Sequence, residues 1–515
     1  MNAIELNLFS SRITAICDEM GTVLRRTSFS PNIKDRLDFS CAVFDANGLL
    51  CAQAAHIPVH LGSMAFAMAS IVQIVNWCPQ DMLVLNDPFL GGTHLPDVTL
   101  IAPVFHQAGG ALLGFVANRA HHADIGCESP GSMPISRSLL EEGRVIPPTL
   151  LYRQGALQKS ALQLMTGEED GELDTDFAAQ FSANQIGVQR LNEFVGDLGV
   201  EHYLQGLEEL NDYGDRLASS VIRELSPGSY SFDDVMDDDG VGTLDILLAV
   251  TLHIDSEKVV LDFNNSSKQV RGNLNCPISV AAAAAFYCFR SLMPEFTPAC
   301  AGTFRRINIV ADEGTIVNAK RPAAVVAGNV ETSTRLVDVI LGALAQAAPT
   351  RIPAASQGSM NNVAMGYIDY YNGTRWDYYE TLAGGTGAGP NYAGLDAVHS
   401  HMTNTLNTPI ESVEMHYPLR VLRYAIKPDT GGKGRHSGGN GLVREYEFLA
   451  DAEVSLLTER RRHPPWGLEG GKAGAKGINR LNGEKIPGKC SIHVSAGDRL
   501  QIETPGGGGF GNVRY

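Results

Sequence analysis

The sequence predicts an α+β fold with more than one domain. Short runs rich in Val, Ile and Leu, broken by Pro, Gly and Asn, are typical of strands, and other stretches repeat apolar residues at helical spacing. Strands and helices do not alternate in the regular order of a parallel α/β sheet. The length of 515 residues leaves room for several domains. We therefore expect an N-terminal domain of hairpins and helices and a glycine-rich, β-rich C-terminal part.

The overall charge argues against polyanionic partners. The chain is 44% hydrophobic and 19% charged, which is ordinary for a globular protein, and its formal net charge is −17. No run rich in Lys or Arg is present. Nucleic acid and an anionic membrane surface are therefore not expected as partners, and a small-molecule substrate is favoured.

Apolar runs and cysteines predict a soluble, cytoplasmic chain. The longest apolar run, residues 278–289, has about 12 residues, whereas a membrane-spanning helix needs about 20. The N-terminus lacks a basic stretch followed by an apolar core, so no secretory signal is expected. Nine cysteines form no CxxC pair, and an odd number fits reduced thiols. We expect Cys127 to be a packing residue.

The first elements are predicted as a helix and a hairpin. Apolar residues at helical spacing predict a helix over residues 3–26. Residues 39–44 and 49–52 are predicted strands, and the Asn-Gly pair between them is a typical hairpin turn. Asp38 stands at the start of the first strand. Its place matches that of Asp97 in a later hairpin, which makes Asp38 a candidate ligand.

A second helix is predicted over residues 56–76, and it starts with two histidines. Met64, Phe66 and Met68 are expected on its buried face. For His56 and His60 two interpretations stay open, a role in a functional site or local capping and packing.

The most informative stretch is a predicted hairpin that follows this helix. Residues 83–85, 98–105 and 111–117 read as strands, and Gln107, Ala108, Gly109 and Gly110 form the turn between the last two. A hairpin returns the chain to the end that it left. Residues just before the outgoing strand should therefore lie near residues just after the returning strand; these are His94, Asp97, Asn118, His121 and His122.

Two imidazoles and a carboxylate that converge are a ligand set for a divalent transition metal. Imidazole suits Zn, Fe, Mn or Ni, the carboxylate adds an anionic donor, and three protein ligands leave a position for water or substrate. Asp124 follows the His121-His122 pair in sequence. One histidine of the pair can bind the metal while the next helps to orient the groups around it. The alternative is structural: Asp97 caps a turn, His94 is a solvated loop residue and the histidine pair packs against it.

Beyond the hairpin, the pattern predicts a long loop and then helices. Residues 126–150 are rich in Gly, Pro and Ser, and a loop of this length is usually a binding loop or a lid. Residues 158–225 carry leucines at helical spacing and charged faces. We expect this helical region to close the first domain.

From residue 226 the pattern changes to short strands. The acidic residues 232–240 are predicted as a turn, either solvated or able to bind a cation such as Ca²⁺. Strands are expected at 244–253 and 258–263, and helices at 278–290 and 336–347. The predicted domains are accordingly residues 1–225, which include the helical region 158–225, then a mixed α/β domain 226–420 and a glycine-rich β region 421–515.

The C-terminal third is rich in glycine, but it carries no nucleotide-binding motif. Lys433 and Lys472 each follow a glycine, yet Lys427 and Trp466 stand where the first glycine of a Walker A motif would be. No GxGxxG follows a strand and opens a helix. The glycine-rich loops instead suit a site at which backbone approaches a ligand closely.

Seven motifs, spread in order over the chain, resemble one family, that of hydantoinase B and oxoprolinase. The motifs are NDPFLGGTHLPDV (86–98), NRAHHADIG (118–126), PGSMP (130–134), AGNVETSTR (327–335), ETLAGGTGA (380–388), HMTNTLNTPIE (401–411) and TPGGGGFG (504–511). Members of this family are the B-type components of ATP-dependent N-methylhydantoinases and lactamases, the C-terminal half of 5-oxoprolinases, and a component of the acetone and acetophenone carboxylases.

The resemblance implies a site and a partner. It implies that Asp38, His94, Asp97 and His121 bind a divalent metal, Zn or else Mn or Fe. His122 and Asp124 would stand behind these ligands, with Asp87 as a neighbour. The resemblance further implies that ATP and Mg²⁺ are bound by a companion chain of the hydantoinase A type, in an A2B2 heterotetramer. This fits the missing phosphate loop.

The resemblance also implies the reaction, the ATP-driven opening of a cyclic amide. The A-type chain would phosphorylate the amide oxygen or an activating species, and the metal would supply a hydroxide or polarise the carbonyl. His122, or His60 if it reaches the site, could relay the proton, and backbone amides of the glycine-rich loops could hold the oxyanion. Two alternatives stay open: a component of an ATP-dependent ketone carboxylase, and a non-catalytic scaffold.

Overall fold

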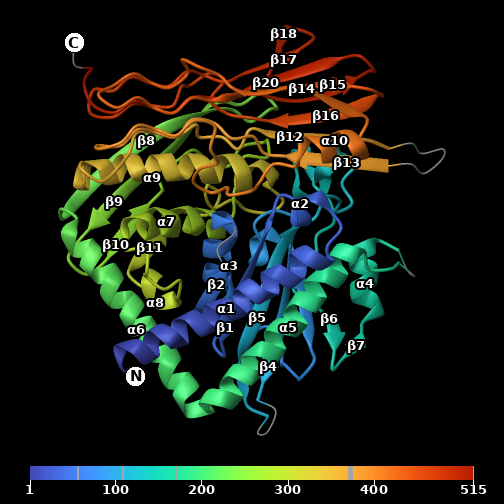
Figure 1. Ribbon diagram of the computed structural model, residues 1–515, viewed down its shortest axis with the longest axis vertical. Helices are drawn as coiled ribbons and strands as arrows, with labels where there is room; N and C mark the ends of the chain where they lie inside the picture. Colours follow the sequence, from blue (N-terminus) through green and yellow to red (C-terminus); the bar gives the residue numbers. More distant parts are fainter. Residues whose placement is uncertain (55–56, 107–109, 169–170, 369–374, 514–515) are drawn as a thin grey trace.

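The computed structural model describes residues 1–54, 57–106, 110–168, 171–368 and 375–513 (Figure 1). In this part of the chain the strands form four sheets, and helices pack against them. The predicted α+β class with several domains is confirmed. The glycine-rich C-terminal sheets lie at one end of the molecule, and the N-terminal end of α1 lies at the other.

The first sheet has seven antiparallel strands in the order β2-β1-β5-β4-β3-β6-β7. Alternate side chains of its central strands enter two different cores, which explains why these strands read as nearly continuous apolar runs. The predicted strands are confirmed, and β5 extends further than expected, to His121. The strands are β1 (Phe39–Asp45), β2 (Leu50–Ala54), β3 (Met82–Leu85), β4 (Asp97–Phe105), β5 (Leu112–His121), β6 (Thr149–Arg153) and β7 (Ala156–Leu157).

Helices cover both faces of this sheet. Figure 1 shows α1 and α5 side by side on one face, and α3 packs on the other. Helix α1 begins with a capping box between Asn2 and Glu5. Predicted residue His56 and the turn residues 107–109 lie outside the described residues. The helices are α1 (Ala3–Thr27), α2 (Pro31–Lys34), α3 (Pro58–Ile71), α4 (Lys159–Thr166), α5 (Thr175–Leu198) and α6 (Val200–Glu224), with short 3₁₀ turns η1 (Pro88–Leu90), η2 (Pro130–Ser132) and η3 (Leu139–Glu141).

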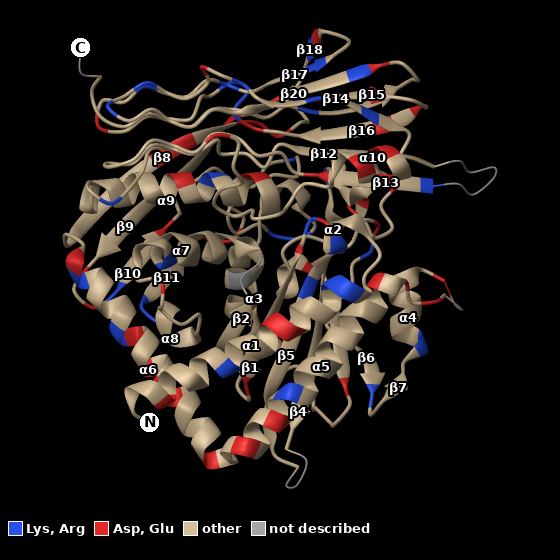
Figure 2. Cartoon of the chain, in the orientation of Figure 1, with Lys and Arg blue, Asp and Glu red and all other residues tan. Residues whose placement is uncertain are grey.

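The middle of the chain forms a four-stranded sheet in the order β11-β10-β9-β8, with α7 and α9 against it. Helix α7 carries almost no charge (Figure 2) and packs between α3 and α9. A Cβ atom at Gly62 would lie 2.4 Å from the Cα atom of Ala283, so the glycine permits this close approach. The elements are β8 (Gly228–Asp238), β9 (Leu244–Ile254), β10 (Val259–Asp262), β11 (Ile307–Val310), α7 (Ile278–Leu292), α8 (Ala301–Phe304), the π-turn η4 (Gly328–Thr332) and α9 (Ser333–Ala347).

The acidic residues 232–240 correct one prediction. They belong mostly to strand β8, not to a turn, and several of their carboxylates have protein partners. Asp234 pairs with Arg460 at 2.7 Å, and Asp237 accepts a hydrogen bond from the backbone N–H of Arg462. The solvated turn and the calcium loop are both wrong, because distant arginines and backbone amides neutralise this acidic run.

Two further sheets share one core in the C-terminal part. Their strand orders are β13-β12-β16-β19 and β14-β15-β20-β17-β18. Strand β12 pairs with β16, so a single sheet contains strands from both sides of the boundary predicted at residue 420. The division into three domains stays a prediction. The elements are β12 (Asn362–Ile368), β13 (Arg375–Glu380), α10 (Ile410–His416), β14 (Leu419–Ile426), β15 (Leu442–Phe448), β16 (Ala452–Leu457), β17 (Ile478–Leu481), β18 (Glu484–Ile486), β19 (Lys489–Val494) and β20 (Arg499–Glu503).

The thiols and the helices bear on two further features of the chain. All nine cysteines are free thiols, and Cys127 is buried. Burial raises the pKa of the Cys127 thiol to about 11, so it stays protonated at neutral pH. Among the residues that the structure describes, no helix is both long enough and apolar enough to cross a lipid bilayer.

Candidate metal centre

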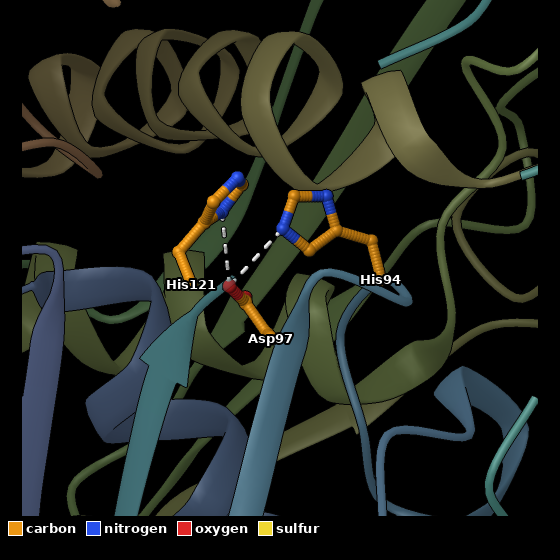
Figure 3. A group of neighbouring side chains, drawn as sticks. All are labelled: His94, Asp97 and His121. Atoms are coloured by element: carbon orange, nitrogen blue, oxygen red, sulfur yellow. Dashed lines mark ion pairs between the residues drawn. The ribbon is translucent and has the colours of Figure 1, made fainter. Parts of the chain in front are cut away.

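The hairpin of β4 and β5 brings three predicted ligands together. Asp97 opens β4, His121 closes β5, and the two residues face each other across the ladder. His94 lies one turn before β4. Its Nε2 atom is 3.1 Å from Oδ1 of Asp97, and Nδ1 of His121 is 3.3 Å from the same oxygen (Figure 3). Each of the three residues is at most 3% exposed.

Oδ1 of Asp97 and Nε2 of His94 face each other, are buried and have no hydrogen-bond partner. The nitrogen of His121 that faces Oδ1 is Nδ1, and its Nε2 is also buried without a partner. Such orphaned atoms are costly unless a ligand satisfies them. Two atoms bound about 2.1 Å from one metal lie roughly 3.0 to 3.4 Å apart at tetrahedral or octahedral angles. The distances to Asp97 fall in this range, so the residues present fit a divalent metal.

The other oxygen of Asp97 is fully occupied by protein donors. Oδ2 accepts hydrogen bonds from the Thr93 hydroxyl at 2.6 Å and from Nδ2 of Asn329 at 3.3 Å. Nε2 of His60 lies 3.2 Å from the same oxygen. Asp97 is therefore held by three groups through Oδ2, and its Oδ1 is left to bind as a monodentate ligand.

A chain of contacts behind His94 fixes its tautomer. Nδ1 of His94 lies 3.2 Å from the carbonyl oxygen of Val326, which can only accept, so Nδ1 carries the proton and Nε2 keeps its lone pair. The backbone N–H of Val326 in turn donates to Glu142 at 3.0 Å. Glu142 belongs to the long loop predicted as a binding loop or lid. In the structure this residue is fully buried and supports the backbone behind His94.

Burial and neighbouring charges set the protonation of the cluster. Burial would raise the pKa of Asp97, but the imidazoles of His94 and His60 hold it well below its usual range. Burial lowers the pKa of His121. For His94 burial also acts downward, but the Asp97 carboxylate outweighs it, and the net shift in pKa is upward. At neutral pH Asp97 is an anion and His121 a neutral imidazole, the forms that bind metals.

An aromatic stack holds His121 from the other side. The ring of Tyr379 stacks on His121 with centroids 4.9 Å apart, and the guanidinium of Arg36 lies 4.7 Å from the centre of the tyrosine ring. Arg36 also lies 3.6 Å from Oδ2 of Asp38. This stack joins the C-terminal sheet, which contributes Tyr379, to the N-terminal hairpin.

Asp97 and His121 of the cluster line a small cavity of about 20 Å³. This volume accommodates about one water molecule or ion. Asp38 and His60 line the cavity together with Asp97 and His121, but the Asp38 carboxylate is not within the 4.8 Å group that His94, Asp97 and His121 form. The remaining lining residues are Ile57, Val59, Asn329, Val330, Met360, Tyr379, Thr381, Met402, Thr403 and Thr405.

Three predicted residues lie away from the cluster of His94, Asp97 and His121. His122 follows His121 on the strand, so its side chain leaves on the opposite face. There it bonds to Gln180 at 2.9 Å and stacks on Phe177. Asp124 is exposed and pairs with Arg375 at 2.9 Å. Asp87, expected as a neighbour, caps η1 and pairs with Arg321. Of the candidates for proton transfer, only His60 lines the cavity.

Several residues of the site were missed from the sequence. Thr93 stands within the motif around His94, but a threonine in a loop carries no chemical signal of its own. Asn329, Glu142 and Tyr379 are far from the hairpin in sequence. No spacing rule could connect them to Asp97, although Asn329 and Tyr379 lie in or beside two of the recognised motifs.

The comparison with known families decides the identity. The sequence model described as hydantoinase B/oxoprolinase matches residues 2–513. The chain belongs to the hydantoinase B/oxoprolinase family. The motifs that suggested this resemblance therefore mark true membership, and the match spans all four sheets of the structure.

Relatives in this family differ in length. 5-Oxoprolinase 1 of Arabidopsis thaliana is 38% identical over 549 residues, and the match covers 99% of this chain but 42% of that protein. A protein of Pseudomonas sp. (strain NS671) named as the B-type subunit of a D-/L-hydantoinase is 30% identical over 540 residues, with 99% and 90% covered. The chain thus spans less than half of the plant relative and nearly all of the bacterial one.

Two solved structures share the fold. The ATP-dependent caprolactamase from Pseudomonas jessenii superposes with a TM-score of 0.91 at 26% identity, over 99% of this chain and 91% of that chain. A nucleotide-free acetone carboxylase structure gives a TM-score of 0.87 at 18% identity, over 99% and 76%. The second likeness shows the fold alone. Family members therefore include enzymes of ATP-dependent cyclic amide hydrolysis.

Proposed function

We propose that this chain is the metal-containing component of an ATP-dependent enzyme that opens a cyclic amide of the hydantoin, 5-oxoproline or lactam type. The observation that carries the proposal is the buried group of His94, Asp97 and His121, in which Nε2 of His94 and Oδ1 of Asp97 face each other without a hydrogen-bond partner. Family membership and the likeness to a caprolactamase support the reaction class. The metal would be Zn, or else Mn or Fe.

Asp38 is proposed as a fourth ligand. It lines the same cavity and precedes β1, which pairs with β5. The backbone N–H of His121 donates to the Asp38 carbonyl at 3.1 Å, so the two residues are neighbours. A modest rotation of the carboxylate away from Arg36 would aim it into the cavity.

Residues around the metal would transfer protons and bind the substrate or water. When bound, a divalent metal lowers the pKa of a water molecule toward neutrality or polarises a carbonyl. His60 lines the cavity and its Nδ1 lies 3.4 Å from the Ser40 hydroxyl, so we assign proton transfer to His60. Oδ1 of Asn329 is buried without a partner and would accept a hydrogen bond from a ring N–H or from water.

ATP would be bound by a companion A-type chain together with Mg²⁺. The sequence has no nucleotide motif, the Pseudomonas relative is named as one subunit of an enzyme, and the plant relative is more than twice as long as the matched region. We propose an A2B2 heterotetramer in the cytoplasm. Activation on the companion chain would turn the amide into a better electrophile, and ring opening would follow at the cavity described above.

The test is metal content and ring opening measured together. The chain is purified with its A-type companion, as wild type and as His94→Ala. We expect about one equivalent of Zn, Mn or Fe in the wild type, with ATP-dependent opening of at least one of 5-oxoproline, hydantoin or caprolactam. In His94→Ala both should be lost. A wild-type complex that is fully active without metal would overturn the proposal and leave the chain as a scaffold.

The carboxylase alternative is separated by the same preparation. Only the fold likeness to acetone carboxylase supports it, and that likeness is below 25% identity. Incubation with ATP, a ketone and ¹³C-bicarbonate distinguishes the two reactions. Label in the product carbon would favour the carboxylase, whereas ring opening without label supports the cyclic amide hydrolase.

A further inference from the structure

The C-terminal part exposes a group of large apolar side chains around strand β14. Leu422, Tyr424 and Ile426 on this strand are 39%, 42% and 50% exposed, and Leu406 and Met415 beside it are 52% and 76% exposed. We call these five residues the β14 face. Single exposed apolar residues are normal, but these five lie on one strand and on segments that contact it, which makes them a candidate interaction surface.

The position of β14 in its sheet strengthens this interpretation. It is the edge strand of the order β14-β15-β20-β17-β18, and from Leu422 to the end of the strand every residue is exposed. A bulge between Val421 and Arg423 breaks the ladder register. Bulges and charged residues protect an edge against pairing with a further strand. A partner would therefore pack against the side chains of this face and would not extend the sheet.

The β14 face lies directly behind one wall of the metal cavity. The hydroxyl of Tyr424 donates to Oδ1 of Asn407 at 3.0 Å, and Nδ2 of Asn407 donates to the carbonyl of Thr381 at 2.8 Å. Thr381 and Thr405 line the cavity and share a hydrogen bond of 2.9 Å. The exposed Leu406 thus follows a residue whose side chain faces the candidate metal site.

This wall borders a small cavity and carries an unsatisfied polar atom. The cavity of about 20 Å³ cannot admit a lactam ring, since ligand pockets usually have about 300 to 1,000 Å³. The hydroxyl of Ser400 is buried without a hydrogen-bond partner. A buried group of this kind destabilises the arrangement that it is in. It therefore lowers the cost of rearranging the segment 399–408 when a partner binds.

A second exposed apolar region lies too far from the metal. On α1, Leu6 lines a groove of about 830 Å³ with Phe296, and the exposed Leu8 lines another of about 500 Å³. Helix α1 has 25 residues and is about 37 Å long, and these residues are at its N-terminal end, away from Arg36 and Asp38. Figure 1 places that end opposite to α10 and β14. An activated intermediate that water would destroy needs a short path, which favours the β14 face.

We propose that the β14 face is the docking surface of the ATP-binding companion chain. This inference rests on the proposed function. The companion is the expected occupant because the plant relative carries more than half of its length outside the region that this chain matches, and that additional part needs a place on this fold. A companion on the β14 face would be separated from the metal cavity by the single segment 399–408, so activated substrate could pass without release into water.

The test measures binding of an A-type chain from the same organism to three variants. Leu422→Arg/Ile426→Arg places two charges on the β14 face, Met415→Glu changes the most exposed residue of the face, and Leu8→Arg is the control on α1. We expect the double variant to bind at least 100-fold more weakly, Met415→Glu at least 10-fold more weakly, and Leu8→Arg within twofold of wild type. Thermal unfolding and metal content verify that each variant is folded.

Two results would overturn the inference. One is wild-type affinity in both β14-face variants. The other is a set of three observations: the wild-type chain alone forms a dimer in sedimentation, the double variant is a monomer, and the double variant still binds the companion. This set would assign the β14 face to contact with a second copy of the chain. Ring opening by the wild-type complex is measured separately. If the complex forms through this face but opens no ring, the proposed function fails and the docking surface stands.

Discussion

The end of β5 determines which side of the sheet faces the proposed metal site. His121 and His122 are adjacent, yet only His121 faces the cavity, while His122 bonds to Gln180 behind the sheet. We predict that His121→Asn lowers the affinity for Zn²⁺ or Mn²⁺ at least 100-fold, because a ligand is lost. His122→Asn should keep its metal, with a lower melting temperature from the lost stacking on Phe177. Elemental analysis after dialysis measures both variants. Equal loss of metal in both would contradict the assigned faces.

Glu142 makes stability depend on pH. Burial raises the pKa of this carboxyl from its ordinary 4.5 to about 7, although backbone N–H groups and Ser136 partly oppose the shift. Because the pKa is raised in the folded state, the protonated carboxyl contributes its full stability below about pH 4.5. This contribution is lost as the pH rises through about 7. The shift corresponds to about 3 kcal/mol. From pH 5 to pH 8, the free energy of unfolding of wild type should therefore fall by about 2 kcal/mol relative to that of Glu142→Gln.

Urea unfolding of the metal-free proteins at the two pH values measures this difference. The glutamine keeps an oxygen for the N–H groups of Val325 and Val326, so the variant should retain the fold behind His94. Parallel stability profiles of the two proteins would show that Glu142 does not ionise in this range.

At the scale of elements, local sequence patterns predicted the hairpins but not which other strands pair with them. The Asn-Gly turn and the Val- and Ile-rich runs predicted β1, β2, β4 and β5, and hairpin geometry alone predicted that Asp97 and His121 would meet. The pairing of β1 with β5, which brings Asp38 beside His121, depends on sheet order. Sheet order is a tertiary property that no single hairpin encodes.

Contacts between distant elements were beyond local patterns for the same reason. Asn329 reaches Asp97 from η4, a π-turn that no periodicity predicts. The acidic part of β8 was misread as a turn because its arginine partner, Arg460, is 226 residues away. Spacing alone does not distinguish which of the adjacent residues His121 and His122 faces the cavity. That depends on where β5 ends.

The π-turn η4 depends on one glycine. A Cβ atom at Gly328 would lie 1.9 Å from the carbonyl oxygen of Asn275, so the backbone must shift if any side chain is added. That backbone carries Val326 and Asn329, which contact His94 and Asp97. We predict that Gly328→Ala destabilises the protein by at least about 2 kcal/mol and weakens metal binding at least tenfold.

Gly196 supplies the matched control for this substitution. It lies on the exposed side of α5, and a Cβ atom there would meet nothing within 4 Å. Gly196→Ala should stabilise the protein by about 0.5 to 1 kcal/mol, because alanine favours the helix. Chemical denaturation and metal titration measure both variants. Unchanged metal affinity in a folded Gly328→Ala protein would remove the supporting role of η4.

At the scale of the whole molecule, buried charges join the middle sheet to the C-terminal sheets. Glu459 pairs with Lys489 and, at 3.1 Å, with Arg335 of α9, and all three side chains are fully buried. Arg460 bridges Asp234 of β8 and Asp338 of α9. Figure 2 shows α9 and β8 next to the C-terminal part of the chain. Glu459 and Arg460 follow β16 there, and Lys489 begins β19. The regions of the chain are therefore expected to unfold together.

This network predicts that charge balance matters more than any one pair. Lys489→Met leaves Glu459 with one cation fewer in a dry environment, and removing one partner of a buried pair costs about 3 to 5 kcal/mol. Glu459→Gln/Lys489→Met removes both charges and restores the balance, so we predict that the double variant recovers at least half of that loss. Denaturant unfolding of both variants and of Glu459→Gln gives the coupling free energy.

All three variants should keep their metal, since none of these side chains lines the cavity. Additive losses would instead show that the pair acts as two independent packing groups, and the regions would then be free to unfold in separate transitions.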